Sequence, residues 1–179
     1  MATSIFNSKL INAIRKLLID RNETISVAES VTSGMLQLAF STADKAIYFY
    51  QGGITTYNLG QKTRHLHIDP IYAKDCNCVS EKTVAEMALN VSRLFTSDWS
   101  IAVTGYASPV PESGNKLFAW YALVYHGEIV VTQKFNLESG DPFEVQLFYC
   151  NEILNSFHQL LNKKTAVKKP KKAKGAKEQ

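Results

Sequence analysis

Hydroxyl side chains cluster in one short segment that follows an apolar run near the start of the chain. Positions 28–34 read A-E-S-V-T-S-G, and an apolar helical pattern resumes after them. The first turn of a helix leaves backbone N–H groups unpaired, and these groups together with the helix dipole can hold a phosphate or a developing oxyanion. Ser30 could also act as a nucleophile if a base lies nearby. The alternative is plain N-capping, because Ser and Thr are preferred caps whatever the function.

A base for Ser30 is the second requirement of this chemistry. None of the histidines lies in a loop that also carries a well-placed carboxylate; they are His65, His67, His126 and His158. Lys62 is the other candidate, because a lysine whose pKa is lowered by burial can take the proton of a serine. The alternative for Lys62 is a solvated lysine on the surface of a helix.

Two short segments contain residue types that bind zinc, namely H-L-H at 65–67 and C-N-C at 76–78. Structural zinc sites usually space their cysteines as C-x₂₋₄-C, and alternating histidines on a helix point apart. We therefore expect no metal site and no cofactor.

Helical and strand patterns alternate along the first half of the chain. Apolar spacing, cap residues and proline at a first helical position predict helices over 4–21, 35–40, 58–67, 81–95 and 142–161. Apolar and β-branched runs predict strands over 24–28, 46–57, 99–104, 118–125 and 128–135, the last two joined by a two-residue turn. Gly52 and Gly53 predict a bulge or a close backbone approach in the second strand. This order predicts an α/β protein, a three-layer α/β/α sandwich with a mixed sheet.

The charge of the chain divides it into two parts. The stretch 163–179 holds eight lysines and Glu178, a net charge of +7, so residues 1–162 carry 12 basic and 15 acidic residues, a net charge of −3. Residues 1–162 suit one folded domain. The lysine-rich stretch lacks aromatic residues and is predicted to be a disordered tail, capable at most of weak contact with nucleic acid or another polyanion.

Several classes of protein are disfavoured by the same composition. No apolar run approaches the ~18 to 20 residues that span a bilayer, so we expect no membrane contact. The first ten residues lack the apolar stretch of a signal peptide, and three cysteines do not form an even disulfide framework. The expected location is the cytoplasm.

Five segments, in order, resemble the CinA C-terminal domain, also known as the nicotinamide-nucleotide amidohydrolase (NMN deamidase) family. Positions 28–34 resemble its A-E-S-x-T-G-G signature, and 48–58 with Lys62 resemble its F-x-G-G-x-V-x-Y-S-N-x-x-K block. Positions 78–81 are similar to its A-V-S-E helix start, 102–109 to its x-x-[ST]-G-I-A-G-P loop, and 140–141 to the start of its G-D-R motif. The resemblance spans about residues 8 to 160.

The resemblance implies a metal-free hydrolase that converts the carboxamide of nicotinamide mononucleotide to the acid and ammonia. It implies Ser30 as nucleophile, Lys62 as its base and Tyr57 as a supporting hydrogen-bonding group. It further implies a homodimeric α/β/α sandwich and a set of substrate-binding residues: Glu29, Thr32, Ser33, Gly34, Gly53, Asn58, Thr104 and Gly105.

The chain departs from the family pattern where the substrate would be held. The two arginines of the family's G-D-R-x-x-V-R motif are replaced by Pro142 and Gln146, which leaves no cation there for a phosphate or carboxyl group. Two motif glycines are replaced by Ser33 and Ser108, and the K-P-V-G-T stretch is replaced at 114–118. These departures leave two alternatives to the amidohydrolase: a catalytically degenerate domain that binds a nucleotide or protein partner, and a nucleic-acid-associated protein acting through its basic tail.

Overall fold

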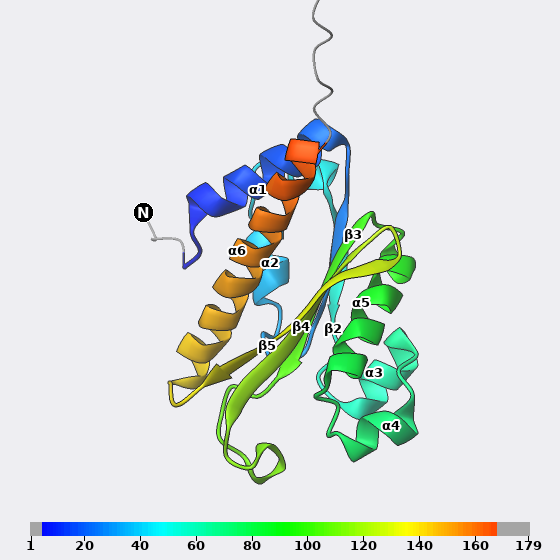
Figure 1. Cartoon of the computed structure of the whole chain (residues 1–179), viewed down its shortest axis with the longest axis vertical. Coiled ribbons are helices and arrows are strands. Elements are labelled where there is room, and N and C mark those ends of the chain that lie inside the picture. The colour runs from blue at the N-terminus through cyan, green and yellow to red at the C-terminus, as the bar shows by residue number, and fades with distance from the viewer. Residues whose placement is uncertain (1–4, 168–179) are drawn as a thin grey trace, which may run out of the picture.

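A mixed five-stranded sheet forms the centre of the molecule in the computed structural model, which describes residues 5–167 (Figure 1). The strands are arranged in the order β2-β1-β3-β4-β5. Strands β2, β1 and β3 are parallel, whereas β4 pairs antiparallel with both β3 and β5. Their bounds are β1 Ile25–Glu29, β2 Tyr50–Thr55, β3 Trp99–Gly105, β4 Leu117–Tyr125 and β5 Glu128–Leu137. The prediction of a mixed sheet is confirmed.

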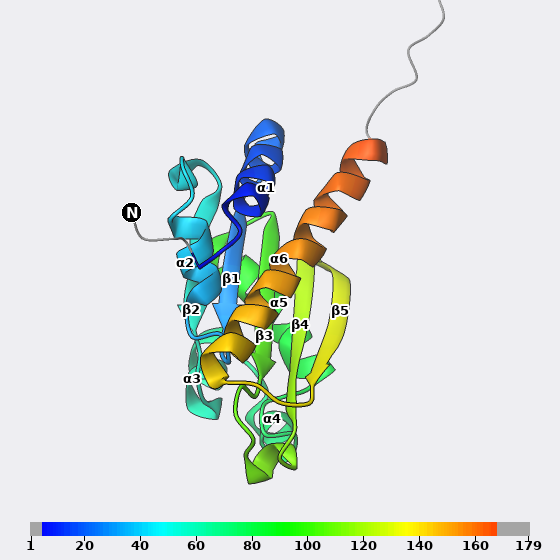
Figure 2. The same ribbon diagram turned by 90° about the vertical axis from the view of Figure 1, so that its left-hand side faces the viewer.

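Helices cover both faces of this sheet (Figures 1 and 2). One face carries α1 Ser8–Arg21, α2 Met35–Ser41 and α6 Pro142–Val167, and the other carries α3 Leu59–Leu66, α4 Pro70–Asp75 and α5 Glu81–Phe95. Two short 3₁₀ turns, η1 Ala46–Tyr48 and η2 Pro111–Ser113, lie in the connections. The three-layer α/β/α arrangement matches the prediction.

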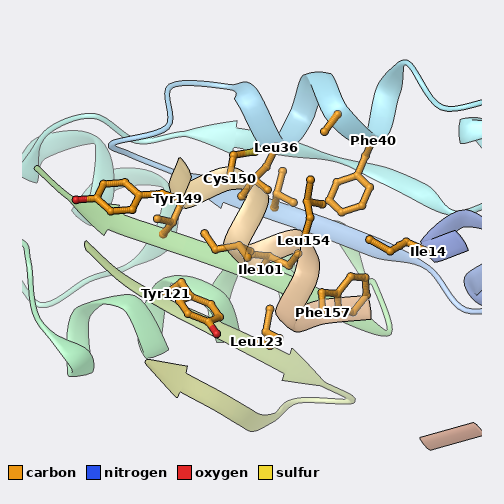
Figure 3. Packing of buried hydrophobic residues seen from close by; sticks show 14 of the residues in the cluster. Ile14, Leu36, Phe40, Ile101, Tyr121, Leu123, Tyr149, Cys150, Leu154 and Phe157 are labelled. Carbon is orange, nitrogen blue, oxygen red and sulfur yellow. The ribbon is translucent and has the colours of Figure 1, made fainter. Parts of the chain in front are cut away.

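The apolar core is divided by the sheet into two clusters. Successive side chains of a strand point to opposite faces, so Val27 of β1 packs toward α6 whereas Ala28 packs toward α5. The cluster on the α6 face is the larger and includes Phe40, Ile101 and Phe157 (Figure 3). The same alternation directs Glu29 toward α2 and leaves Ser30, the next residue, free to face α3.

The starts of two predicted elements lie several residues later in the structure. Helix α1 begins at Ser8 rather than at residue 4, because the Asn7 side chain caps it by accepting a hydrogen bond from the Leu10 amide at 3.2 Å. Residues 46–48 form η1 and not the start of a strand, because the Phe49 amide bonds back to the Ala46 carbonyl. The predicted irregularity in β2 is confirmed as a register shift opposite Ile25.

Helix α4 was not predicted, although its sequence carries a recognisable start signal. Asp69 caps it by accepting from the Ile71 amide at 2.9 Å, and Pro70 occupies its first turn. The same Asp-Pro arrangement begins α6, where the Phe143 amide donates to Asp141 at 3.0 Å. Helix α6 continues to Val167, past the predicted end at 161 and into the stretch assigned to the tail. Residues 168–179, for which a disordered tail is predicted, lie outside the described residues.

Candidate active site

The carboxyl ends of the three parallel strands meet at one edge of the sheet. Ser30 follows β1, Tyr57 and Asn58 follow β2, and Thr104 lies near the end of β3. In α/β sheets this edge is where ligands bind. A pocket of about 820 Å³ opens there, a size within the range of small-molecule sites. The pocket therefore lies where the sequence motifs converge.

Ser30 and Lys62 are in direct contact in this pocket. The Lys62 Nζ atom donates to the Ser30 Oγ atom at 2.9 Å and to the Thr56 carbonyl at 2.7 Å. Helix α3 positions the lysine: Asn58 caps the helix by accepting from the Gln61 amide at 3.0 Å, and Lys62 follows within the first turn. The fold thus brings together two side chains that are 32 residues apart in the sequence.

Burial changes the acid–base chemistry of Lys62. Its side chain is 1% exposed, and none of the ion pairs among residues 5–167 includes it. Removal from water lowers its pKa to about 8, and the charge interaction with Cys78, the smaller cause, acts in the opposite direction. With that pKa, about a tenth of the amine is neutral at pH 7 and about half at pH 8. A neutral amine can donate to the Thr56 carbonyl and still accept the proton of Ser30.

The start of α2 is not open to a ligand, which corrects the expectation of an anion site there. The Glu29 carboxylate, itself 0% exposed, accepts from the backbone amides of the first turn, Gly34 at 3.2 Å, Leu36 at 3.0 Å and Gln37 at 2.9 Å. The helix begins at Met35, so its dipole and amides serve Glu29 and not a group bound at Ser30.

The amide of Val31 is a different donor near the serine. Val31 lines the pocket, and its N–H makes no hydrogen bond to any residue in the range 5–167. The backbone N–H that follows a nucleophilic serine is a common oxyanion donor in hydrolases.

Other predicted residues fall on the pocket wall without contacting the Ser30–Lys62 pair. Tyr57 is 72% exposed at the rim, and within the described part of the chain its hydroxyl has no hydrogen bond to Ser30 or Lys62. Asn58, Thr104 and Gly105 also line the pocket. The Thr104 hydroxyl donates to the Cys78 carbonyl at 2.9 Å, which ties the loop before α5 to the end of β3.

Five residues predicted to bind substrate lie off the pocket wall: Glu29, Thr32, Ser33, Gly34 and Gly53. The Thr32 hydroxyl donates to Glu29 at 2.6 Å, and Ser33 contacts the Ser30 carbonyl at 3.4 Å. Gly53 has a packing role, because a Cβ atom there would lie 2.4 Å from Val27 Cγ2. These residues shape the turn and the strand that support the pocket.

Several pocket residues were not identified from the sequence. Lys74 of α4, Asn77 of the following loop, Tyr106 and Glu112 all line the pocket. Pro142 and Gln146, which replace the family arginines, also line the pocket. Lys74 is therefore a second cation on the wall, contributed by an element other than the one that carries the family arginines. The Asp69-Pro70 start of α4 was the signal that could have located it.

Within 5–167, no three His, Cys, Asp or Glu side chains are grouped so that they could hold a metal ion. No helix in that range combines the length and the hydropathy needed to cross a bilayer.

Comparisons with known proteins agree with this architecture. Residues 7–161 match the family described as CinA C-terminal domain. A CinA-like protein of Prochlorococcus marinus is 32% identical over 149 residues, covering 82% of this chain and 35% of the relative. A CinA-like protein of Synechocystis is 37% identical over 98 residues, covering 55% of this chain and 24% of the relative.

Solved structures extend the agreement to three dimensions. A competence-damaged protein (CinA) superfamily structure from Enterobacter cloacae has a TM-score of 0.82 at 28% identity, covering 90% of this chain and 95% of that one. The corresponding protein from Escherichia coli has a TM-score of 0.80 at 28% identity, covering 90% and 93%. The chain spans between about a quarter and about a third of the length of these two curated relatives. On the match over residues 7–161, the chain belongs to the CinA C-terminal domain family.

Proposed function

We propose that this pocket hydrolyses the carboxamide of nicotinamide mononucleotide, or of a related pyridine nucleotide, to the acid and ammonia. The observation that supports the proposal best is the 2.9 Å contact between Ser30 and an amine that is buried without a carboxylate partner. An amine in this environment has the depressed pKa that a general base needs near neutral pH. The resemblance in the sequence motifs supplies the substrate class.

The proposed reaction uses Ser30 and Lys62 in two half-reactions. Neutral Lys62 takes the Ser30 proton as Oγ attacks the carboxamide carbon, and the Val31 amide stabilises the oxyanion. The Lys62 ammonium then returns a proton to the departing nitrogen, which leaves as ammonia. In the second half, Lys62 activates a water molecule that attacks the acyl-serine, and the nucleotide acid leaves as Ser30 regains its proton.

Lys74 is the group we propose for the substrate phosphate. Pro142 and Gln146 offer no positive charge on their side of the pocket, and Lys62 is occupied by Ser30 and Thr56. Lys74 is the remaining cation among the residues that line the pocket. A lysine binds phosphate as a mobile point charge, so it can replace an arginine without reproducing the bidentate geometry.

The test is ammonia release by the purified chain from nicotinamide mononucleotide, with nicotinamide riboside and free nicotinamide as related substrates. We expect turnover of the nucleotide that Ser30→Ala abolishes. Absence of ammonia from all three amides counts against the amidohydrolase. Turnover that survives Ser30→Ala counts against the serine mechanism alone.

A binding domain without turnover is the second candidate. The observation that favours it is the loss of both family arginines on the pocket wall, at Pro142 and Gln146. This candidate predicts that calorimetry detects nucleotide binding that is unchanged by Lys62→Met, with no ammonia formed. The amidohydrolase instead predicts that Lys62→Met binds the nucleotide but no longer consumes it.

A further inference from the structure

The geometry points to Glu29 as a positioning residue that holds the Ser30 hydroxyl against the Lys62 amine. This inference rests on the proposed function. Glu29 does not line the pocket, so its effect must pass through the residues that it binds.

The Glu29 carboxylate gathers the turn that carries Ser30. One oxygen, Oε2, accepts from the Thr32 hydroxyl at 2.6 Å and from the amides of Gly34 and Leu36. The other, Oε1, accepts from the Gln37 amide at 2.9 Å. Every donor lies two to seven residues beyond Ser30, so the carboxylate determines the path of the chain on the far side of the serine.

The backbone of Glu29 is linked to the anchor of Lys62. Its carbonyl accepts from the Thr56 amide at 2.8 Å, and the Thr56 carbonyl accepts from Lys62 Nζ at 2.7 Å. The serine follows Glu29 directly in the chain, and the lysine is two hydrogen bonds away. One residue thus connects the two strand ends from which the reacting groups come.

In the described part of the chain, backbone amides, and not a cation, compensate the charge of Glu29. A buried carboxylate without a cation is costly, and within residues 5–167 no ion pair includes Glu29. Its charge is instead balanced by backbone amides at a helix start. A glutamine there has a single acceptor oxygen, and its NH₂ group would face backbone N–H donors.

Glu23 provides a matched control at the opposite end of β1. It is 6% exposed, accepts from Trp99 Nε1 at 2.8 Å and from the Tyr125 hydroxyl at 2.9 Å, and, unlike Glu29 among the described residues, forms an ion pair with Arg21 at 3.6 Å. Both glutamates are buried acceptors beside the same strand, but Glu23 precedes Ile25 and lies away from the pocket. Loss of either charge should lower the melting temperature, whereas only Glu29 should affect Ser30.

The experiment measures how fast a fluorophosphonate labels Ser30, by intact-protein mass spectrometry with Ser30→Ala as background. We expect Glu29→Gln to label about a hundredfold more slowly than the wild type, because small displacements of a reacting group cost rates of this order. Glu23→Gln should label within about twofold of the wild type even though it melts earlier, because its contacts lie away from Ser30. The labelling rate of Glu29→Gln should also lose its rise with pH, because Ser30 no longer contacts Lys62.

Crystal structures of both variants provide a measurement independent of reactivity. In Glu29→Gln the Ser30 Oγ to Lys62 Nζ distance should exceed hydrogen-bonding reach, and in Glu23→Gln it should stay near the 2.9 Å of the wild type. If Glu29→Gln does not fold, Thr32→Val removes only the 2.6 Å hydroxyl contact and should slow labelling about threefold or more, the value of one lost hydrogen bond.

Equal labelling of wild type and Glu29→Gln, or an unchanged distance, overturns the inference. Equal slowing in the two glutamine variants shows a general loss of stability and overturns it as well. If Ser30 is labelled but no amide is hydrolysed, the proposed function fails while the positioning role of Glu29 stands. If the wild type is not labelled at all, the crystallographic distances decide the question for Glu29.

Discussion

The carbonyl oxygen of Thr56 accepts a hydrogen bond of 2.7 Å from the amine of Lys62, six residues further along the chain. The same amine also contacts the Ser30 hydroxyl, 32 residues away in the chain, at 2.9 Å. Only the neutral amine keeps a lone pair for the serine proton. The protonation state of Lys62 therefore controls both the chemistry and part of the stability of the domain.

Hydrolytic activity should rise with pH until the pH exceeds the Lys62 pKa of about 8. Burial lowers the pKa of Lys62 to about 8, and only the neutral form can act as a base. We expect kcat/KM for nicotinamide mononucleotide to rise about tenfold per pH unit below that value and to level off above it. Steady-state ammonia release between pH 6 and pH 9.5 measures this, and a flat profile across that interval contradicts Lys62 as the base.

The free energy of unfolding should rise with pH above about 8 because of the same group. The folded-state pKa of Lys62 is lowered from 10.5 to about 8, so burying the ammonium costs free energy below pH 8. That cost falls as pH rises from 8 to 10.5, because in this interval the unfolded chain still binds the proton that the folded amine has released. Relative to Lys62→Met, the wild type should gain about 2 kcal/mol of unfolding free energy between pH 8 and pH 10.

Urea unfolding of the wild type and of Lys62→Met at several pH values measures this difference. The Lys62→Met protein is the control, because its stability changes with pH only through the other titrating groups. If the difference between the two proteins is constant from pH 8 to pH 10, the Lys62 amine titrates in the folded state as it does in water.

Lys74 should discriminate substrates by their phosphate. We expect Lys74→Gln to raise KM for nicotinamide mononucleotide about tenfold, the value of one charge-assisted contact, and to leave KM for nicotinamide riboside unchanged. The effect should shrink with added salt, since Lys74 is exposed. Lys16→Gln, on α1 and paired with Asp20, is a matched control that should change neither substrate. Equal KM changes for the phosphorylated and unphosphorylated substrates would remove Lys74 from phosphate binding.

Gly53 should resist substitution because of packing. A Cβ atom at Gly53 would lie 2.4 Å from Val27 Cγ2 and 2.9 Å from the Val27 carbonyl. We expect Gly53→Ala to lower the free energy of unfolding by about 1 to 3 kcal/mol through overpacking. Gly60→Ala is the control: its new atom would meet nothing closer than Asn58 Oδ1 at 3.5 Å, so the added helix propensity should raise stability by up to about 1 kcal/mol. Chemical denaturation of the two variants compares them, and equal effects would show that the contacts with Val27 relax freely.

Local sequence patterns predicted most of the elements. The apolar repeat of α5, its Ser80 cap and the β4–β5 hairpin were predicted closely, because periodicity and caps are local properties of the chain. Helix α4 was missed because it has only six residues, too few for a periodic pattern. The aromatic and β-branched residues of η1 favour a strand, so the sequence predicts one there. In the structure, local backbone hydrogen bonds form a 3₁₀ turn instead.

The sequence by itself determined the α/β class, the family resemblance and the identity of Ser30 and Lys62 as candidates. Only the tertiary structure decided that these two side chains touch, because their contact depends on β1 lying between β2 and β3 in the sheet. The tertiary structure also directed Glu29 away from the pocket and placed Lys74 on its wall. Alternation along β1 is local and separates Glu29 from Ser30, but contacts between segments far apart in the chain decide which face meets α2, which face opens to the pocket and where α4 packs.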